Sequence, residues 1–157
     1  MEVLESAKRI LQTAGWYEGR KIDITEMIKL LEGREFEVFP KAEEFLEEFS
    51  ALEIIVKCNH SQEVIKKYML RECDIHHTNV FKALGDSIFY AYAQQFEFFA
   101  GEKLVIVGSI SNDNLFLMVS ETGKIYCDSG KLGDDVWEAW DTLFNLSEKG
   151  IVGWQYL

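Results

Sequence analysis

Apolar positions along the first third of the chain follow the spacing of amphipathic helices. A first helix leads up to Gly15 and carries an apolar stripe made of Val3, Leu4, Ala7, Ile10, Leu11 and Ala14. A second helix starts at Asp23, which fits a capping box with Glu26, and ends at Gly33. A third begins near Pro40, a residue suited to a first helical turn, and its stripe is Ala42, Phe45, Leu46 and Phe49.

The middle of the chain combines one strand with further helices. Residues 52–58 are rich in β-branched side chains and alternate loosely, which favours a strand. The stretch 59–78 has no clear period, apart from a short helical pattern at 62–70. A longer helix follows over residues 88–99 and ends at Gly101.

The last part of the chain changes to strands. Three are predicted at 103–110, 114–120 and 124–127, and the turn sequences SNDN and ETG between them indicate an antiparallel meander. A closing helix over 134–144 has a buried side made of Val136, Trp137, Trp140, Leu143 and Phe144. This order predicts an α+β fold in which helices cover one face of a largely antiparallel sheet. Without repeats or a linker, residues 1–157 form one domain.

Composition and charge narrow the class of partner. The chain has 157 residues, of which 48% are hydrophobic and 13% aromatic, enough for a real core. Its net charge of −11 is spread as −5 over residues 1–80 and −6 over residues 81–157. A surface with this negative charge repels phosphate backbones and anionic lipid headgroups. This argues against nucleic acid and membrane surfaces as partners. A basic protein would be attracted instead.

The chain start and the cysteines indicate where the protein works. The first residues, MEVLESAKRILQTAG, are charged and helical, and no stretch approaches the ~18 apolar residues of a membrane span. The three cysteines, Cys58, Cys73 and Cys127, include no CxxC pair, which fits a reducing compartment. We therefore predict a cytoplasmic protein.

Two of the predicted helices carry acidic stripes. The third helix has four glutamates opposite its apolar stripe: Glu43, Glu44, Glu47 and Glu48. They form two like-charged pairs one turn apart, each of which destabilises an isolated helix by about 0.2–0.5 kcal/mol. The closing helix has a second stripe opposite its tryptophans, without an offsetting lysine: Asp134, Glu138 and Asp141. From the residues alone these stripes are either solvated faces, the commoner case, or a docking surface for a basic partner.

Residues of the kinds that bind metals or act as nucleophiles gather in one stretch. It contains Cys58, His60, Cys73, His76 and His77, all of them ligand types that zinc accepts. The spacing lacks the CxxC-type knuckle of structural zinc sites, so we favour partly buried thiols beside surface histidines and predict no cofactor. A small zinc-dependent hydrolase is the enzymatic alternative. The chain has neither a G-x-S-x-G elbow nor a phosphate-binding loop.

The stretch AGWYEGRK permits two interpretations. Trp16, directly after the helix-ending Gly15, could fold back as a lid on the core, with Arg20 turned toward an acidic neighbour or a carbonyl group. A tryptophan with an ordinary structural role in a loop is the simpler interpretation.

Four stretches, taken in order, resemble the SUKH superfamily of bacterial immunity proteins, and most closely its third subgroup: LQTAGWYEGRKIDI, KAEEFLEEFSAL, LFLMVSETGKIYC and KLGDDVWEAWDTLF. The subgroup's A-G-W-x-x-x-R element falls on Ala14, Gly15, Trp16 and Arg20, and its A-x-x-F-L-x-x-F helix falls on Ala42, Phe45, Leu46 and Phe49. Its G-x-I/V-Y turn falls on Gly123, Ile125 and Tyr126, and the Leu-Gly before the last helix falls on Leu132 and Gly133. The resemblance spans residues 11–146. It departs where the family has F-G-G-L, because Ser50 and Ala51 replace both glycines.

The resemblance implies an α+β protein without catalysis that binds and neutralises a polymorphic toxin, in many cases a nuclease, made by the same cell. A nuclease holds phosphates with lysines and arginines, so the acidic stripes become the expected binding surface. The partner is then a basic protein toxin, and the immunity protein is a monomer or a weak dimer. Other branches of the superfamily are intracellular regulatory or scaffold modules, which is the alternative function.

Overall fold

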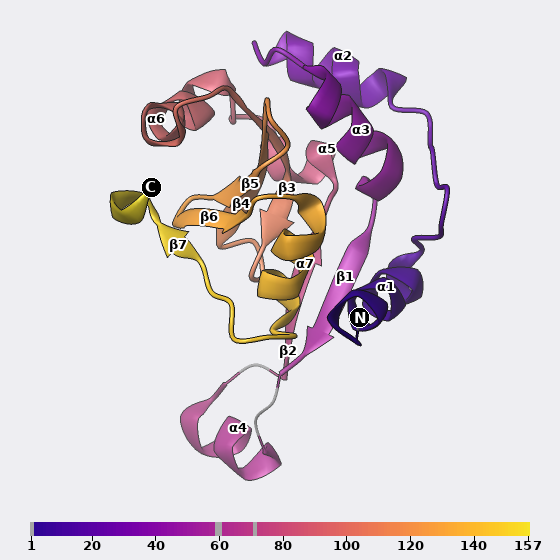
Figure 1. Cartoon of the computed structure of the whole chain (residues 1–157), viewed down its shortest axis with the longest axis vertical. Helices are drawn as coiled ribbons and strands as arrows, with labels where there is room; N and C mark the ends of the chain where they lie inside the picture. Colours follow the sequence, from indigo (N-terminus) through magenta and orange to yellow (C-terminus); the bar gives the residue numbers. More distant parts are fainter. Residues whose placement is uncertain (1, 59–60, 71) are drawn as a thin grey trace.

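The computed structural model describes residues 2–58, 61–70 and 72–157. Within these residues, seven strands form one antiparallel sheet whose order follows the chain: β1 (Glu53–Lys57), β2 (Cys73–His77), β3 (Leu104–Ile110), β4 (Leu115–Ser120), β5 (Ile125–Cys127), β6 (Gly130–Gly133) and β7 (Val152–Gly153). Each strand pairs with the next one along the chain, so the whole sheet is a meander (Figure 1). The antiparallel sheet predicted from the sequence is confirmed.

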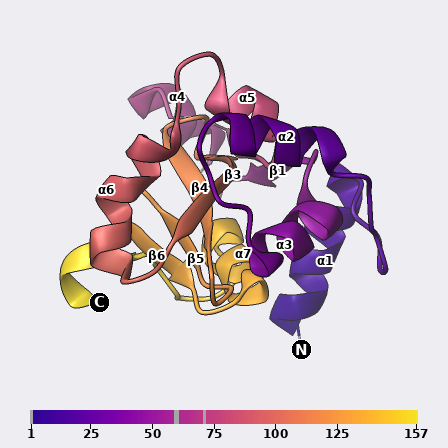
Figure 2. The ribbon, with the colours of Figure 1, turned by 90° about the horizontal axis from the view of Figure 1, so that it is seen from above.

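The helices of the described residues lie on both sides of this sheet. They are α1 (Glu2–Ala14), α2 (Thr25–Gly33), α3 (Pro40–Phe49), α4 (Gln62–Tyr68), α5 (Val80–Leu84), α6 (Tyr90–Ala100) and α7 (Val136–Phe144), with a short 3₁₀ turn, η1 (Trp154–Tyr156). Figure 2 shows α1, α3 and α7 on one side of the sheet and α6 on the other. Every residue of β3 is buried, because three helices pack on this strand: α3, α5 and α6. The α+β class is thus confirmed, but the expectation of a single covered face is wrong.

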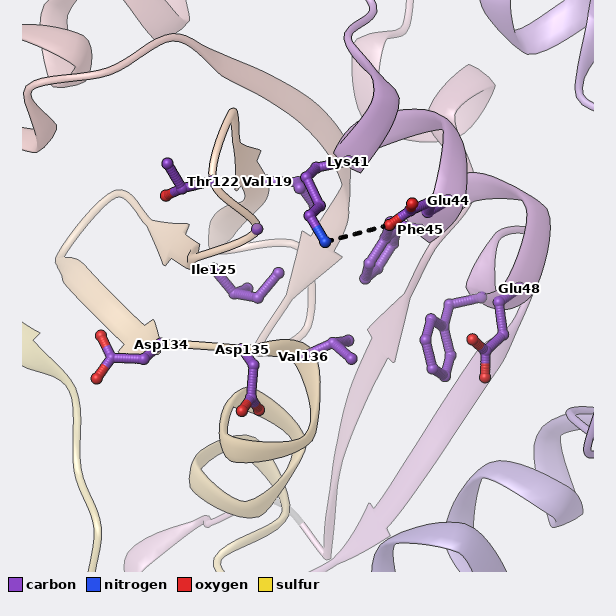
Figure 3. A pocket seen from close by; sticks show the side chains of 12 residues that line it. Lys41, Glu44, Phe45, Glu48, Val119, Thr122, Ile125, Asp134, Asp135 and Val136 are labelled. Atoms are coloured by element: carbon purple, nitrogen blue, oxygen red, sulfur yellow. Dashed lines mark ion pairs between the residues drawn. The ribbon is translucent and has the colours of Figure 1, made fainter.

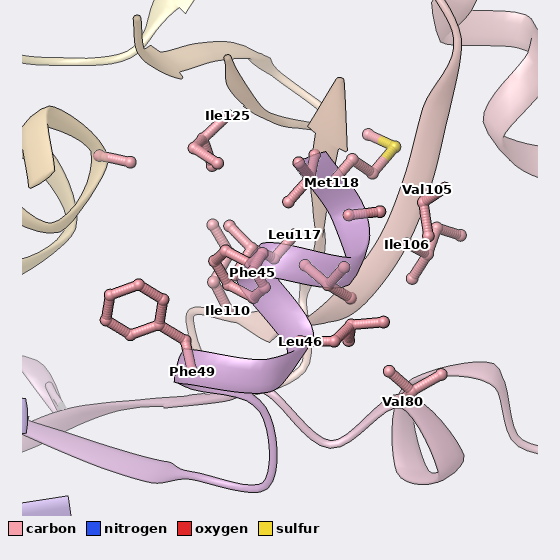
Figure 4. Packing of buried hydrophobic residues seen from close by; sticks show 14 of the residues in the cluster. Phe45, Leu46, Phe49, Val80, Val105, Ile106, Ile110, Leu117, Met118 and Ile125 are labelled. Atoms are coloured by element: carbon pink, nitrogen blue, oxygen red, sulfur yellow. The ribbon is translucent and has the colours of Figure 1, made fainter. Parts of the chain in front are cut away.

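The apolar stripe of α3 lies against the centre of the sheet. Phe45, Leu46 and Phe49 are buried against side chains of β3 and β4, among them Ile110 and Leu117 (Figure 4). Each large apolar side chain buried in this way contributes about 1.5–3 kcal/mol to folding. The helical period of the sequence therefore identified the buried face of α3 correctly.

The second helix ends at Gly33, as predicted, but begins differently from the prediction. Its N-cap position is Ile24 rather than Asp23, and no capping box forms. Asp23 instead accepts hydrogen bonds from the backbone nitrogen and hydroxyl of Thr25, at 3.0 and 2.6 Å. Gly33 is the last residue of the helix, and the chain turns away at Glu35, whose backbone is left-handed with φ 74°.

Short elements without a clear period were missed. They are β2, β6, β7 and the five-residue α5. Burial does not alternate along β2, so its sequence CDIHH lacks the apolar–polar alternation that predicts a strand. The two residues of β7 become a strand only by pairing with Gly130 and Lys131 of β6.

Candidate functional site

A groove of about 200 Å³ opens between α3, the turn that joins β4 to β5, and the start of α7 (Figure 3). Its floor is apolar and is formed by Phe45, Phe49, Val119, Ile125 and Val136. Its rim carries the carboxylates of Glu44, Glu48, Asp134 and Asp135. The groove therefore joins the two helical segments for which the sequence predicts acidic stripes, although 85 or more residues separate them along the chain.

The α3 wall of the groove follows from the amphipathic pattern. Pro40 occupies the first turn of α3, and the buried stripe turns Glu44 and Glu48 toward the groove. Lys41 also lines the groove, and its Nζ lies 3.4 Å from a carboxylate oxygen of Glu44 (Figure 3). Both side chains of this ion pair are at least half exposed, so it is a weak contact that a partner can replace.

The turn between β4 and β5 closes the groove at Gly123. This glycine has φ 90°, in the left-handed region that favours glycine. A Cβ atom at this position would also approach Lys41 to 3.3 Å, so glycine lets the turn lie close to α3. The neighbouring Thr122 is held by Glu102, which accepts hydrogen bonds from its backbone nitrogen at 3.0 Å and its hydroxyl at 2.9 Å.

The start of α7 supplies the opposite rim. Asp135 is the N-cap residue, and its side chain accepts a hydrogen bond from the Glu138 backbone nitrogen at 2.8 Å. Asp134 accepts a hydrogen bond from the Lys131 ammonium at 2.7 Å, which holds the pKa of Asp134 below its usual value. Both carboxyls are therefore oriented by local contacts before any partner arrives.

A strap formed by residues 15–22 supports the rim residue Glu48 from behind. Trp16 is buried, and its indole nitrogen donates to the Glu48 carboxylate at 3.0 Å. Arg20 donates to the backbone carbonyl of the same glutamate at 2.6 Å. The Trp16 ring packs edge-on against Trp137 and is stacked with Phe49, at centroid distances of 5.6 and 6.4 Å. Of the two interpretations of AGWYEGRK, the lid with Arg20 turned to a carbonyl group is the one observed.

The remaining acidic residues of the predicted stripes do not line the groove. Glu43 is exposed on the far side of α3, and Glu47 is half buried, 3.7 Å from the Lys21 ammonium. Glu138 lies 3.4 Å from Lys149, so the expectation of a stripe without an offsetting lysine is wrong.

Asp141 corrects the predicted stripe most clearly. Only 5% of this residue is exposed, and one carboxylate oxygen accepts a hydrogen bond from the Ser147 hydroxyl at 2.9 Å. Residues 139–144 of α7 are all buried, because α7 is enclosed between α1 and β6 rather than lying on the surface. The expectation that Asp141 faces outward is therefore wrong.

The cysteines and histidines do not converge on one point. Neighbouring residues of a strand point to opposite faces, so His76 and His77 are separated, and so are Cys73 and Asp74. Cys58 lies at the end of β1, and its pairing with Glu72 places its side chain on the face opposite Cys73. His60 lies outside the described residues. Among those that are described, no three His, Cys, Asp or Glu side chains are placed to hold a metal ion.

Sequence reasoning also missed groove residues. Lys41, Thr122 and Asp135 line the groove but were not predicted as site residues. For Asp135 a signal was available, since an Asp three residues before a Glu at a helix start is a capping pattern. Thr122 had no local signal, because only the packing of the turn against α3 brings it to the groove.

Residues 3–146 match the model of the protein family described as SUKH-3 immunity protein. The chain belongs to the SUKH-3 immunity protein family. This match confirms the resemblance carried by the sequence motifs and supports a bacterial immunity role for this SUKH-3 chain. Searches of curated proteins and of solved structures found no match. None of the helices in the described part of the SUKH-3 chain has the length and apolarity needed to span a membrane.

Six of the residues on which the family resemblance rests lie at the groove. Those that line it are Phe45, Phe49, Gly123 and Ile125, and those that hold Glu48 are Trp16 and Arg20. Gly133 leads into α7, and a Cβ there would lie 2.5 Å from the Ala139 backbone nitrogen. Others lie elsewhere, among them Leu46, which is buried in the core, and Tyr126, which stacks on Trp154 at a centroid distance of 5.2 Å.

Proposed function

We propose that this protein neutralises a cognate polymorphic toxin, a nuclease, by binding basic side chains of the toxin in the acidic groove. The observation that carries the proposal is the combination of an aromatic and aliphatic floor with four carboxylates around it. Membership of an immunity protein family supports the toxin as the partner. Such proteins generally act by binding, so no catalytic step is proposed.

The shape and charge of the groove suit a lysine or arginine side chain. A volume of about 200 Å³ admits one or two side chains rather than a folded element. The alkyl stem of an arginine could pack on Phe45 and Phe49 while its guanidinium group reaches the carboxylates of Glu44 and Asp134. A nuclease needs such cations to hold phosphates, so capturing them in the groove would block its substrate site.

The first experiment is co-expression with the toxin domain encoded beside this protein, scoring cell survival and then co-purification. We expect the wild-type chain to protect the cells and to form a complex. A Glu44→Gln/Asp134→Asn variant should lose at least about tenfold in affinity, because two rim charges that contact the toxin are removed without changing shape. A scaffold or regulatory role would follow instead if the wild-type chain neither protected the cells nor bound any neighbouring toxin.

Glu43→Gln/Asp86→Asn is the matched control. It makes the same two chemical changes, one Glu→Gln and one Asp→Asn, at exposed positions that do not line the groove. Binding by this variant should stay within about twofold of the wild type, since only long-range electrostatics change. Equal losses for the control and for the groove variant would place the contact elsewhere on the acidic surface.

A further inference from the structure

Helix α4, which lies between β1 and β2 along the chain, projects from the body of the molecule (Figure 1). We call residues 61–70 the α4 arm. None of its residues is buried, and Ile65 alone is half buried. The helix is specified locally: the Ser61 hydroxyl accepts a hydrogen bond from Val64 at 3.2 Å, and Met69 ends the helix in a left-handed conformation with φ 54°.

The α4 arm exposes large apolar side chains. Met69 is 91% exposed and Tyr68 61%, and Val64 and Leu70 are also exposed. A seven-residue helix gains too little from its own hydrogen bonds to be stable in water without packing. Apolar side chains gathered at one projecting tip are typical of a contact with another molecule.

The charge of the α4 arm is opposite to that of the rest of the chain. Lys57, Lys66 and Lys67 are exposed, and within the described residues none of the three forms an ion pair. The arm itself carries a net charge of +1, from Lys66 and Lys67 against Glu63, whereas the whole chain carries −11. A basic toxin would be repelled by this segment, so the partner that fits the arm is acidic and offers an apolar pocket.

The groove of a second copy of this chain has both properties. We propose that the α4 arm of one copy docks in the acidic groove of another, an inference that rests on the groove being a binding site. Tyr68 and Met69 then cover the apolar floor, and Lys66 and Lys67 meet the carboxylates of the rim. The contact is between copies, because the arm projects at the end of the sheet away from α3 and the β4–β5 turn (Figure 1).

This arrangement has two consequences. The arm and the groove are different surfaces, so each added copy leaves one arm and one groove open, and association continues beyond a pair unless a ring closes. The toxin and the arm compete for the same groove. Toxin binding therefore dissociates the assembly, and the free protein keeps its groove covered until a toxin arrives.

Sedimentation of the purified full chain across a concentration series tests the proposal. At low salt, about 50 mM, the mean mass should rise with concentration, and at about 500 mM the rise should be lost because the ion pairs are screened. A Lys66→Glu/Lys67→Glu variant should associate at least about tenfold more weakly. An Arg9→Glu/Lys29→Glu variant is the matched control, since it changes the net charge equally at exposed positions outside the arm. It should associate like the wild type.

Mixing two deficient variants gives the decisive result. Glu44→Lys/Asp134→Lys removes the groove contact and leaves the arm intact, whereas Tyr68→Ser/Met69→Ser removes the apolar part of the arm and leaves the groove intact. Each should be monomeric alone, and their mixture should form a one-to-one complex. It should grow no further, because the arm of the second variant keeps Lys66 and Lys67, which the lysines introduced in the groove of the first repel.

Three results would overturn the proposal: a wild-type chain that stays monomeric at low salt, an arm variant that associates like the wild type, or a mixture without a complex. The toxin test remains separate, because the arm variant keeps its groove and should still protect cells. Protection with no self-association would therefore reject only the arm contact. Self-association through the arm without toxin binding would reject only the toxin assignment.

Discussion

Ala51 has a left-handed backbone, with φ 61°, directly after the end of α3. This conformation costs an alanine free energy through contact between Cβ and the backbone, whereas glycine adopts it freely. The Ala51 backbone nitrogen donates to the Thr78 carbonyl at 2.8 Å, which holds the turn in place. Ser50 has an ordinary φ of −71°, and its buried hydroxyl donates to the Leu46 carbonyl. Of the two residues that replace family glycines, only Ala51 is strained.

We expect Ala51→Gly to raise the free energy of unfolding by about 0.5–1 kcal/mol, since relief of strain exceeds the added entropy of the unfolded chain. The Ala51 side chain is exposed and loses no packing. Ser50→Gly is the control and should lower stability by about 1–2 kcal/mol, because it adds flexibility and removes a buried hydrogen bond. Urea unfolding of both variants measures the difference, and a destabilised Ala51→Gly protein would contradict the strain argument.

At the scale of elements, β2 is attached to the turn between β3 and β4 by side chains. Ser111, Asn112 and Asp113 all have left-handed backbones in that turn. His76 Nδ1 accepts a hydrogen bond from the Ser111 backbone nitrogen at 3.0 Å, and His77 Nε2 lies 3.0 Å from an Asp113 carboxylate oxygen. Strands β2 and β3 pair at His77 and Ser109, and these side-chain contacts add to that pairing.

The two histidines make stability depend on pH. Burial lowers the pKa of both His76 and His77 below the ordinary 6.5, with Lys82 adding to the effect on His77. Asp74 opposes this shift at His76, and Asp113 and Glu53 oppose it at His77. Both residues are therefore harder to protonate in the folded protein than in the unfolded chain. Their full contribution to stability is present above pH 6.5 and is lost as the pH falls from 6.5 toward the folded pKa values, because the unfolded chain binds protons first.

The free energy of unfolding should fall by up to about 1 kcal/mol per histidine between pH 6.5 and 5.5. His76→Gln retains an acceptor for the Ser111 backbone nitrogen but cannot titrate in this range. We expect this variant to be less stable at pH 7.5 and to show a flatter dependence on pH than the wild type. Urea titrations at three pH values measure both effects. An unchanged slope in the variant would show that His76 does not contribute.

At the scale of the whole molecule, the net charge of −11 acts beyond the groove. A field of one sign raises the rate at which a basic partner arrives, and salt screens it. On the proposal that the groove holds the toxin, contacts inside it determine how long the partner stays. The two effects can therefore be separated by kinetics.

The association rate constant with the toxin should fall at least about tenfold between about 50 and 500 mM salt, while the dissociation rate constant changes less than about threefold. Surface plasmon resonance across a salt series measures both constants. The Glu44→Gln/Asp134→Asn variant should mainly dissociate faster, because in the proposed complex the lost charges contact the toxin. An association rate independent of salt would exclude electrostatic steering.

The sequence by itself determined the elements whose apolar residues repeat with a clear period. The stripe of α3 is buried as predicted, and β3, β4 and β5 form the predicted meander. The stripe of α7 is buried at Trp140, Leu143 and Phe144, whereas in α1 only Ala7 and Leu11 are buried and Leu4 is exposed. These features were readable because the helical and strand periods are local and each buried face needs only its own residues. The family resemblance was also readable in the sequence, and the family match confirms it.

Tertiary structure alone decided which acidic residues share a site. Glu44 and Asp134 meet at one groove because α3 and α7 pack over the same face of the sheet, whereas Glu43 turns away and Asp141 is enclosed. It also decided the strand β7, which exists only through pairing, and the role of Trp16 as the support of Glu48. The physical reason is that the charge of a residue shows only that its side chain tolerates water. Whether that side chain is buried, and which residues lie next to it, depends on distant parts of the chain that pack beside it.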